Sequence, residues 1–355
     1  MMSTTDTGIA PVRVMVVDDS AFMRFTISKH LNETPGITVV TTARDGKEAL
    51  ELIPKYQPDV ITLDVEMPRL DGISTLREIM TNFPRPVIMV SSLTSEGAVE
   101  TVQALTLGAV DFITKPAFKA NVNTILQDLV KKVMRASRAR VWAIPRSQGA
   151  LLTTQNSVPK RPLRKLELKE KIVVIGSSTG GPRALNTVIP NLPGNLPASV
   201  LIVQHMPAGF TRSLAERLDS ISHLSIKEAE PGDTLEVGRC LMAPGGFHML
   251  LDQNGQIILN QNPPVHGVRP AVDVTMLSVV QRYGARTVGV ILTGMGNDGT
   301  NGTAVVHSSG GWVITEAEET CVVWGMPRSV FEAGFANEVI PLPKVADAIT
   351  RAVES

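Results

Sequence analysis

The chain has 355 residues, of which 43% are apolar, so its length predicts two domains that can each bury a core. Lys and Arg total 34, as do Asp and Glu, so the sequence lacks the overall positive charge of nonspecific nucleic-acid binders, and we expect no nucleic-acid partner. The polar start has no apolar core of signal-peptide length, and no apolar run reaches the roughly 18 residues of a spanning helix. We expect a cytoplasmic protein without direct membrane insertion. Its two cysteines, Cys240 and Cys321, lack metal-site spacing and are predicted to be reduced structural thiols.

The first domain is predicted to span residues 12–134, after a flexible N-terminus at residues 1–11. Runs of β-branched residues bounded by turn formers are typical of parallel strands buried on both faces. Alternation of such strands with helical patterns implies right-handed βαβ crossovers and a doubly wound, flavodoxin-like α/β sheet. The predicted strands are Val12–Val17, Val39–Ala43, Val60–Leu63, Val87–Val90 and Asp111–Thr114, and the last helix covers about 121–138.

Reactive side chains follow the ends of these strands. Asp18 and Asp19 close the first strand and Asp64 closes the third. Neighbouring strand ends meet in such a sheet, so the three carboxylates would crowd, and a hard cation, usually Mg²⁺, relieves their repulsion. Ser91 and Lys115 end two further strands, where a hydroxyl and an ammonium would hold phosphoryl oxygens. The ordered set predicts phosphoryl transfer to an aspartate oxygen.

On these residues, the segment 12–134 resembles a two-component receiver domain. The resemblance implies that Asp64 is the phosphoacceptor and that Asp18, Asp19 and Asp64 hold the Mg²⁺ needed for phosphorylation. It also implies that Ser91 and Lys115 read the phosphoryl state. Phe112, three residues before the lysine, stands where receivers carry a switch aromatic.

A basic segment, residues 135–170, is predicted to be an interdomain linker. Between residues 135 and 165 it has no acidic residue, and Gln, Ser, Thr and Pro fill much of it. Its charge favours either a solvated tether or a contact with an acidic partner. Its basic residues are Arg135, Arg138, Arg140, Arg146, Lys160, Arg161, Arg164 and Lys165.

Residues 171–355 are predicted to form a second, Rossmann-like α/β domain. Strands alternate again with helical patterns, which indicates a second doubly wound parallel sheet. The predicted strands lie near Ile172–Gly176, Val200–Gln204, Cys240–Ala243, Thr287–Leu292 and Trp312–Thr315.

The first strand of this domain runs into a serine-bearing turn, Gly176-Ser177-Ser178-Thr179-Gly180, which matches G-x-S-x-G. Small residues around Ser178 allow a sharp strand-to-helix turn that exposes the hydroxyl, and the helix N-terminus supplies N–H groups for an oxyanion. A serine nucleophile needs a base to take its proton. His205 ends the next predicted strand and would lie beside the turn, whereas His248, past another strand end, is a second choice.

The orienting acid is predicted to be Asp298, in the glycine-rich loop after the strand 287–292. The structural alternative is that Asp298 caps the following helix. The chain order Ser, His, Asp differs from that of ordinary α/β-hydrolases, but triads are defined by geometry and roles. His30, His223, His266 and His307 have no comparable placement and are expected to be surface or core-packed residues.

A dinucleotide site is the main rival for the glycine-rich turn. That site requires an acidic residue at the end of the second strand to hold the ribose hydroxyls. Here this strand ends in Gln204-His205, which argues against a nucleotide.

Five segments resemble the catalytic domain of chemotaxis protein-glutamate methylesterases (CheB type). They are Gly176–Pro182, Gln204–Phe210, Arg269-Pro270 with Asp273, Leu292–Gly299 and Gly325–Arg328. With the receiver-like segment in front, the resemblance covers nearly the whole chain.

The resemblance implies hydrolysis of glutamyl γ-methyl esters on chemoreceptors, with release of methanol, and deamidation of receptor glutamines. Ser178, His205 and Asp298 would form the triad, the N–H of Met295 would stabilise the oxyanion, and Thr179 would shape the pocket. It further implies a chemotaxis histidine kinase as phosphodonor and no cofactor for the esterase. From the tandem order we expect the unphosphorylated receiver to inhibit the esterase.

Two other classes of protein are compatible with a receiver. A DNA-binding regulator would need a compact helix-turn-helix after the linker, which the alternating strands beyond residue 171 argue against. A nonenzymatic scaffold would keep Asp64 and would not need the triad.

Overall fold

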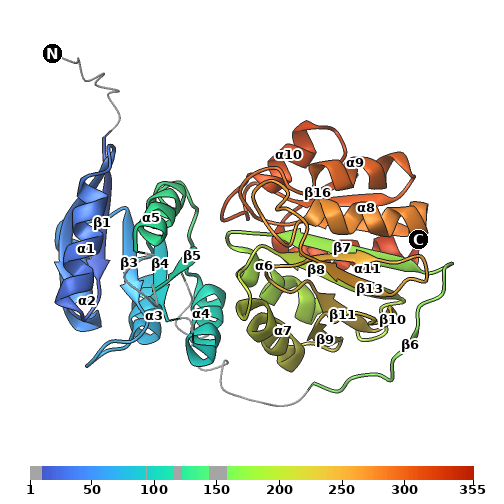
Figure 1. Cartoon of the computed structure of the whole chain (residues 1–355), viewed down its shortest axis with the longest axis horizontal. Helices are drawn as coiled ribbons and strands as arrows, with labels where there is room; N and C mark the ends of the chain where they lie inside the picture. The colour runs from blue at the N-terminus through green and yellow to red at the C-terminus, as the bar shows by residue number, and fades with distance from the viewer. Residues whose placement is uncertain (1–9, 93, 116–121, 144–157) are drawn as a thin grey trace. The chain divides into compact units, whose positions relative to one another are not determined.

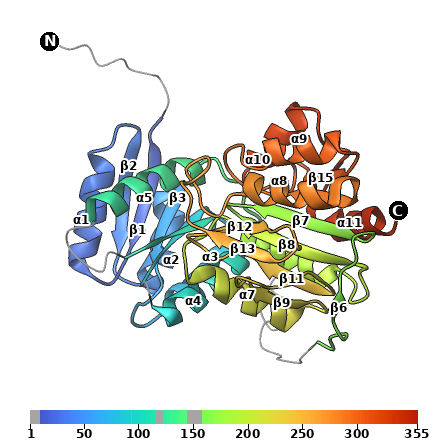
Figure 2. The same cartoon turned by 45° about the vertical axis from the view of Figure 1, so that its right-hand side comes forward.

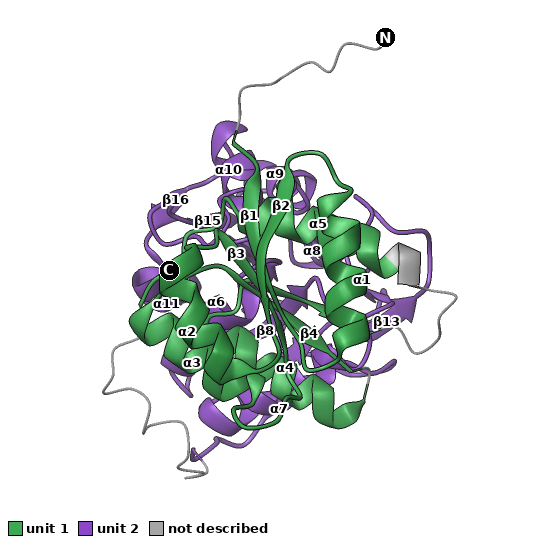
Figure 3. Ribbon diagram, turned by 90° about the vertical axis from the view of Figure 1, so that its left-hand side faces the viewer, with its two compact units in different colours: residues 1–150 green, residues 151–355 purple. Residues whose placement is uncertain are grey.

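A computed structural model describes residues 10–92, 94–115, 122–143 and 158–355. The chain divides into two compact units, residues 1–150 and residues 151–355, which Figure 3 colours separately. Most of the predicted flexible N-terminus and the middle of the predicted linker, residues 144–157, lie outside the described residues.

The first unit is built on a five-stranded parallel sheet of order β2-β1-β3-β4-β5. Helices α1 and α5 cover one face of the sheet, and α2, α3 and α4 cover the other (Figure 3). All five residues of both β3 and β4 are buried, which explains their unbroken apolar runs. The elements are β1 Val12–Val17, α1 Ala21–Asn32, β2 Ile37–Ala43, α2 Gly46–Tyr56, β3 Val60–Asp64, α3 Gly72–Asn82, β4 Val87–Ser91, α4 Ser95–Leu107, β5 Asp111–Thr114 and α5 Val122–Ala136.

Polar side chains fix where helices α1 to α4 begin. Each N-cap side chain accepts a hydrogen bond from the N–H three residues on, and such a cap is worth about 1 kcal/mol. The four caps are Ser20, Asp45, Asp71 and Thr94.

The second unit is built on a seven-stranded parallel sheet of order β16-β15-β14-β7-β8-β11-β9. Helices α8, α9 and α10 cover one face, and α6, α7 and α11 cover the other (Figure 1). Strand β7 lies between β14 and β8, so the chain crosses to opposite sides of β7 at a topological switch point, where α/β sheets place their ligands. The main elements are β7 Lys171–Ser177, α6 Gly181–Val188, β8 Ala198–Gln204, α7 Phe210–Ile221, β9 Ser225–Glu228, β11 Arg239–Met242, α8 Val272–Tyr283, β14 Thr287–Ile291, α9 Thr300–Ser308, β15 Trp312–Glu316, α10 Met326–Glu332, β16 Glu338–Ile340 and α11 Val345–Glu354.

The predicted fold class, two doubly wound parallel α/β sheets, is confirmed. The sequence patterns missed the short edge strands and two antiparallel pairs, because segments of two to four residues at a sheet margin have no clear periodicity. One pair, β12 His248–Leu251 with β13 Ile257–Asn260, packs against α8 (Figure 2). The other joins β6 Arg164–Lys165 to β10 Glu236–Val237. Single turns of 3₁₀ helix complete the unit: η3 Ile189–Asn191, η4 Gly284–Arg286 and η5 Leu342–Lys344.

The second half of the basic segment is attached to the second unit. Besides the β6–β10 pairing, Lys160 forms an ion pair with Asp219, and Leu166 is buried in the core of the unit. This segment therefore contacts its own chain in residues 160–166.

Cys240 and Cys321 are buried and are not joined in a disulfide, and burial raises the pKa of Cys240 far above its usual value, as expected of a structural cysteine. Within the part of the chain that the structure describes, no helix combines the length and the apolar character needed to cross a bilayer.

Candidate functional site

The first unit brings three carboxylates together at the carboxyl ends of β1 and β3. Single oxygens of Asp18, Asp19 and Asp64 lie within 4.8 Å of one another. Asp18 and Asp64 are almost completely buried, whereas Asp19 is exposed, so the cluster opens to solvent on one side. Lys115, which follows β5, places its ammonium 2.7 Å from both carboxylate oxygens of Asp64.

The electrostatics of this cluster favour a bound cation. Burial raises the pKa of Asp64 to about 6, against the opposing effect of the Lys115 ammonium, and burial also raises the pKa of Asp18. One oxygen of Asp18 accepts the N–H of Ser20, but the other, Oδ2, is buried without a hydrogen-bond partner in the described structure. A divalent cation would supply the missing partner and relieve the crowding, so these residues fit Mg²⁺.

Ser91 is the last residue of β4 and Phe112 is the second residue of β5, and the described hydrogen bonds of the Ser91 hydroxyl and the Phe112 N–H go to groups other than the carboxylates of the cluster. The Ser91 hydroxyl, which is buried, donates 3.1 Å to the carbonyl of Gly97 in α4, and its own carbonyl accepts the N–H of Lys115 at 2.6 Å. Phe112 is also buried, and the Lys132 ammonium lies 5.2 Å from its ring centroid. Ser91 therefore links the lysine-bearing strand end to helix α4.

In the second unit, Ser178 lies in the turn between β7 and α6. Gly180 takes φ +79°, and a β-carbon there would come within 2.6 Å of the Val322 side chain, so glycine is required on both counts. Pro182 occupies the first turn of α6. The turn is anchored by a hydrogen bond from the Ser178 N–H to the Thr293 carbonyl at 3.1 Å, and the Ser178 side chain is half-buried.

His205 follows β8 and Asp298 lies in the loop after β14, the strands on either side of β7, and a hydrogen bond joins the two side chains. The distance from His205 Nε2 to Asp298 Oδ2 is 2.7 Å. The His205 side chain is 9% exposed and that of Asp298 is 2% exposed, so the pair is shielded from water. Burial raises the pKa of Asp298, but the hydrogen bond and the charge of His205 outweigh it and lower the pKa below its usual value. Two backbone N–H groups lower this pKa further. Asp298 is therefore ionised at neutral pH and can orient the imidazole.

Those two N–H groups belong to the start of α8. Asp298 Oδ2 accepts the N–H of Val272 at 2.7 Å, and Oδ1 accepts the N–H of Asp273 at 3.0 Å. The carboxylate thus caps a helix as well as orienting the histidine, but the capped helix precedes it in the chain rather than following it.

With Nε2 directed at Asp298, the nitrogen left for the serine is Nδ1. Although Ser178 and His205 are both described, no hydrogen bond joins the serine hydroxyl to the imidazole. Contacts between a nucleophile and its base are often loose without substrate. The second-choice base, His248, is buried, with Nδ1 3.2 Å from the Ala271 N–H and Nε2 3.2 Å from the Pro263 carbonyl. Both of its ring nitrogens are therefore occupied by structural contacts.

Two further residues support this arrangement and were not identified from sequence. Gln204, 1% exposed, accepts the Ser177 hydroxyl at 2.7 Å and donates to the Ser178 carbonyl at 2.9 Å, so it ties the serine turn to the end of β8. His266, assigned no role from sequence, lies 2.9 Å from Asp273. Gln204 occupies the strand end at which a dinucleotide site needs an acid, so its place in the sequence argues against a nucleotide but does not reveal its contact with the serine turn.

Thr179 and Met295 flank the serine. Thr179 is almost buried, and its carbonyl accepts the Thr293 hydroxyl at 3.0 Å. Met295 is 43% exposed, and its N–H makes no hydrogen bond to any residue that the structure describes. This N–H is available to an oxyanion.

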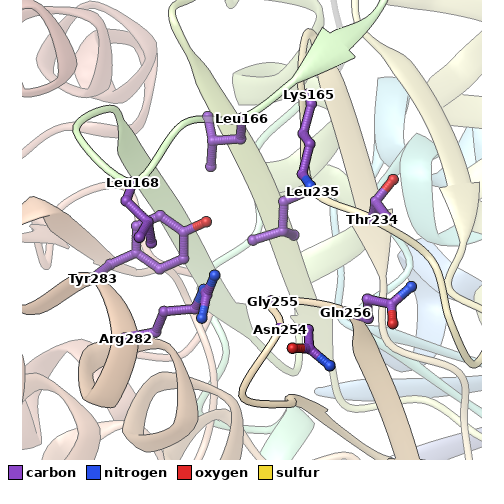
Figure 4. Close-up of a pocket in the computed structure, with 10 residues that line it drawn as sticks. All are labelled: Lys165, Leu166, Leu168, Thr234, Leu235, Asn254, Gly255, Gln256, Arg282 and Tyr283. Atoms are coloured by element: carbon purple, nitrogen blue, oxygen red, sulfur yellow. The ribbon is translucent and has the colours of Figure 1, made fainter.

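One pocket of the second unit, about 260 Å³ in volume, lies apart from these residues. It is lined by three residues of the segment before β7, by two residues before β10, by the β12–β13 turn and by the end of α8. Figure 4 shows Arg282 and Lys165 extending into it. None of the proposed triad residues lines it, so it is not the site of serine chemistry.

Fold and sites together define a class of protein: a receiver unit precedes a second α/β unit with serine, histidine and aspartate at its switch point. The family model of the response regulator receiver domain matches the sequence at residues 14–127, and the family model of CheB methylesterase matches it at residues 173–349. The protein-glutamate methylesterase/protein-glutamine glutaminase of Symbiobacterium thermophilum is 54% identical, with 97% of each chain covered. The Thermotoga maritima protein of the same name is 48% identical, covering 96% of this chain and 98% of that one.

A solved structure agrees with these matches. The crystal structure of the Thermotoga maritima CheB methylesterase catalytic domain is 52% identical with a TM-score of 0.51, and it covers 52% of this chain and 100% of that one. The chain therefore belongs to the protein-glutamate methylesterase/protein-glutamine glutaminase family of response regulators, and it is a hydrolase.

Proposed function

We propose that this chain is a phosphorylation-activated serine hydrolase that removes γ-methyl esters from glutamyl residues of chemoreceptors and deamidates receptor glutamines. It acts in the cytoplasm and serves chemotactic adaptation. The observation that carries the proposal is the 2.7 Å contact between His205 and Asp298 at the sheet edge that bears Ser178. The names of the relatives support the choice of substrate.

The chemistry follows from the arrangement of the triad. Ser178 Oγ attacks the ester carbonyl while His205 Nδ1 takes the hydroxyl proton, and Asp298 stabilises the resulting imidazolium. The N–H of Met295 donates to the oxyanion, an interaction worth about 3 kcal/mol per donor. His205 then protonates the departing methoxide to give methanol, and water hydrolyses the glutamyl-serine ester to free glutamate. No step requires a cofactor, and the same sequence applied to glutamine releases ammonia.

The test is methanol release from methylated receptor by the full chain and by Ser178→Ala. Loss of the nucleophile is expected to lower kcat by about 10⁴-fold or more. Ser220→Ala, which removes an exposed hydroxyl on α7, is the matched control and is expected to retain full activity. Unchanged release by Ser178→Ala would refute the triad, whereas no release by wild type as well would favour a nonenzymatic scaffold.

The first unit receives the signal in this proposal. Asp64 accepts the phosphoryl group from a chemotaxis histidine kinase, and Asp18, Asp19 and Asp64 hold Mg²⁺. The cation, when bound, neutralises charge on the phosphoryl oxygens. Lys115 then exchanges its contact with Asp64 for one with the phosphoryl group, and the Ser91 hydroxyl leaves the Gly97 carbonyl for the same group.

Phosphorylation of Asp64 is proposed to relieve inhibition of the esterase by the receiver unit. A shift from about 1:99 to 99:1 between inhibited and active states needs roughly 5.5 kcal/mol of differential stabilisation. The full chain with Mg²⁺ and acetyl phosphate is expected to release methanol faster than without them, whereas Asp64→Asn is expected not to respond. Equal stimulation of the two chains would refute the role of Asp64.

A further inference from the structure

Glu316, the last residue of β15, is a buried carboxyl group next to the serine turn. Its exposure is 0%. Its Oε2 accepts the backbone N–H of Thr293 at 2.8 Å, and its Oε1 is buried without a hydrogen bond to any described residue. Burying a carboxyl group is costly unless it is well paired, so a residue of this type at this place suggests a role beyond packing.

Thr293 connects Glu316 to the nucleophile. The N–H of Thr293 points to Glu316, and its carbonyl accepts the N–H of Ser178 at 3.1 Å. Two hydrogen bonds through one residue therefore separate the Glu316 carboxyl group from the backbone of the nucleophile. The next residue, Gly294, is so close to the serine that a β-carbon there would lie 2.8 Å from the Ser178 side chain.

The same short turn carries the oxyanion donor. Gly294 is fixed by its N–H to the Val323 carbonyl at 3.0 Å, and its own carbonyl accepts the N–H of Met326 at 2.8 Å. Met295, whose N–H is the proposed oxyanion donor, comes directly after it in the chain. A change in the strength of the hydrogen bond between Thr293 and Glu316 would thus shift the serine and the oxyanion donor together.

The surroundings of Glu316 leave both of its protonation states accessible near neutral pH. Burial raises the pKa of Glu316 to about 7, against the N–H of Thr293, the Thr320 hydroxyl, the Cys321 thiol and the Arg183 charge from α6, which all lower it. The ionised form makes a charge-assisted and therefore stronger hydrogen bond to Thr293 than the neutral acid makes.

We propose that Glu316 is a positioning residue of the esterase. In its ionised form it keeps the turn 293–295 in the catalytic arrangement through its hydrogen bond with Thr293, and protonation weakens that hydrogen bond. The inference rests on the proposed serine chemistry and adds to it a control by proton concentration that is separate from phosphorylation.

The experiment compares kcat and KM for methanol release by the full chain and by Glu316→Gln between pH 5.5 and 8.5. Glutamine keeps an acceptor for Thr293 and mimics the neutral acid. At pH 8.5 wild type is expected to exceed Glu316→Gln in kcat by about 5-fold, the difference between a charged and a neutral hydrogen bond. As the pH falls through 7 the ratio is expected to approach 1, with KM alike in both. Ionisations elsewhere in the molecule are common to both chains and cancel in the ratio.

A second variant separates positioning from folding. Glu316→Met removes the acceptor at similar volume and is expected to lower kcat by about 10- to 100-fold at every pH, since small displacements of reacting groups cost this much. The loss is corrected for the folded fraction measured by circular dichroism. A pH-independent ratio of wild type to Glu316→Gln, or a Glu316→Met loss that vanishes after this correction, would overturn the inference. If Ser178→Ala retained activity, the proposed function itself would fail instead.

Discussion

Replacing Asp298 by asparagine tests the site at the carboxylate that joins the histidine to helix α8. The carboxylate accepts three hydrogen bonds, from His205, Val272 and Asp273. If the asparagine oxygen takes the Oδ2 position, it still accepts the hydrogen bonds from His205 and Val272, and the NH₂ group of its amide faces the N–H of Asp273. The opposite orientation loses the hydrogen bonds from both His205 and Val272. The first orientation is therefore favoured, and the histidine tautomer is preserved.

The cost to catalysis then comes mainly from the lost charge. At an effective dielectric constant of about 20, a value that also serves for buried sites, two unit charges about 4 Å apart attract each other by about 4 kcal/mol. The imidazolium formed during acylation loses this stabilisation, which corresponds to about a 10³-fold lower kcat. The buried N–H of Asp273, left facing a donor, lowers the free energy of unfolding by about 1–3 kcal/mol.

The assay is methanol release from methylated receptor, with urea unfolding of the same preparations. Asp347→Asn, an exposed aspartate in the first turn of α11, is the matched control for loss of one carboxylate and is expected to retain wild-type kcat. A kcat within tenfold of wild type for folded Asp298→Asn would show that this carboxylate does not stabilise the imidazolium.

Three further predictions rest on the geometry of the two sites. His205→Gln is expected to lower kcat by about 10⁴-fold, whereas folded His248→Gln is expected to retain most activity, and the reverse result would exchange their roles. Gly180→Ala introduces both backbone strain and a clash with Val322, and it is expected to lower the free energy of unfolding by about 3 kcal/mol. Gly209→Ala, at φ +89° with open space around the site, is expected to cost about 1 kcal/mol. Equal losses of the two variants in thermal unfolding would refute the contact with Val322. The raised pKa of Asp64 means that the folded protein binds this proton more tightly than the unfolded chain does, so without divalent cations Asp64→Asn is expected to stabilise the first unit by up to about 3 kcal/mol above pH 6. That gain should shrink as the pH falls from 6 to 4, and a gain independent of pH in calorimetry would contradict it.

The positions of the strands were readable from the sequence because buried parallel strands need unbroken apolar runs. The predicted strand 111–114 coincides with β5, and Asp64, Ser178 and His205 were located by the strands that precede them. Residues just past the carboxyl ends of parallel strands lie along one edge of the sheet, so chain position alone predicted which side chains gather at the same edge.

The supporting contacts could not be predicted in this way, because they join segments that are distant in the chain. Glu316 reaches Thr293 across 23 residues, and Gln204 reaches Ser177 across 27. A glutamate ending a strand has no sequence signature that distinguishes a solvated carboxylate from a buried one. The same limit applies to Asp298. A cap on the next helix in the chain is only the alternative to its triad role in the sequence analysis, and the helix whose N–H groups it accepts is α8.

The sequence by itself determined the two α/β units and the carboxylate cluster, and it predicted the serine, histidine and aspartate of the proposed triad, since each depends on local periodicity and strand order. Only the tertiary structure decided which imidazole nitrogen faces Asp298, which N–H remains available to an oxyanion and how Glu316 is held against Thr293. Those properties depend on hydrogen-bond directions and burial, which are set to within about an ångström by packing between distant segments rather than by any one of them.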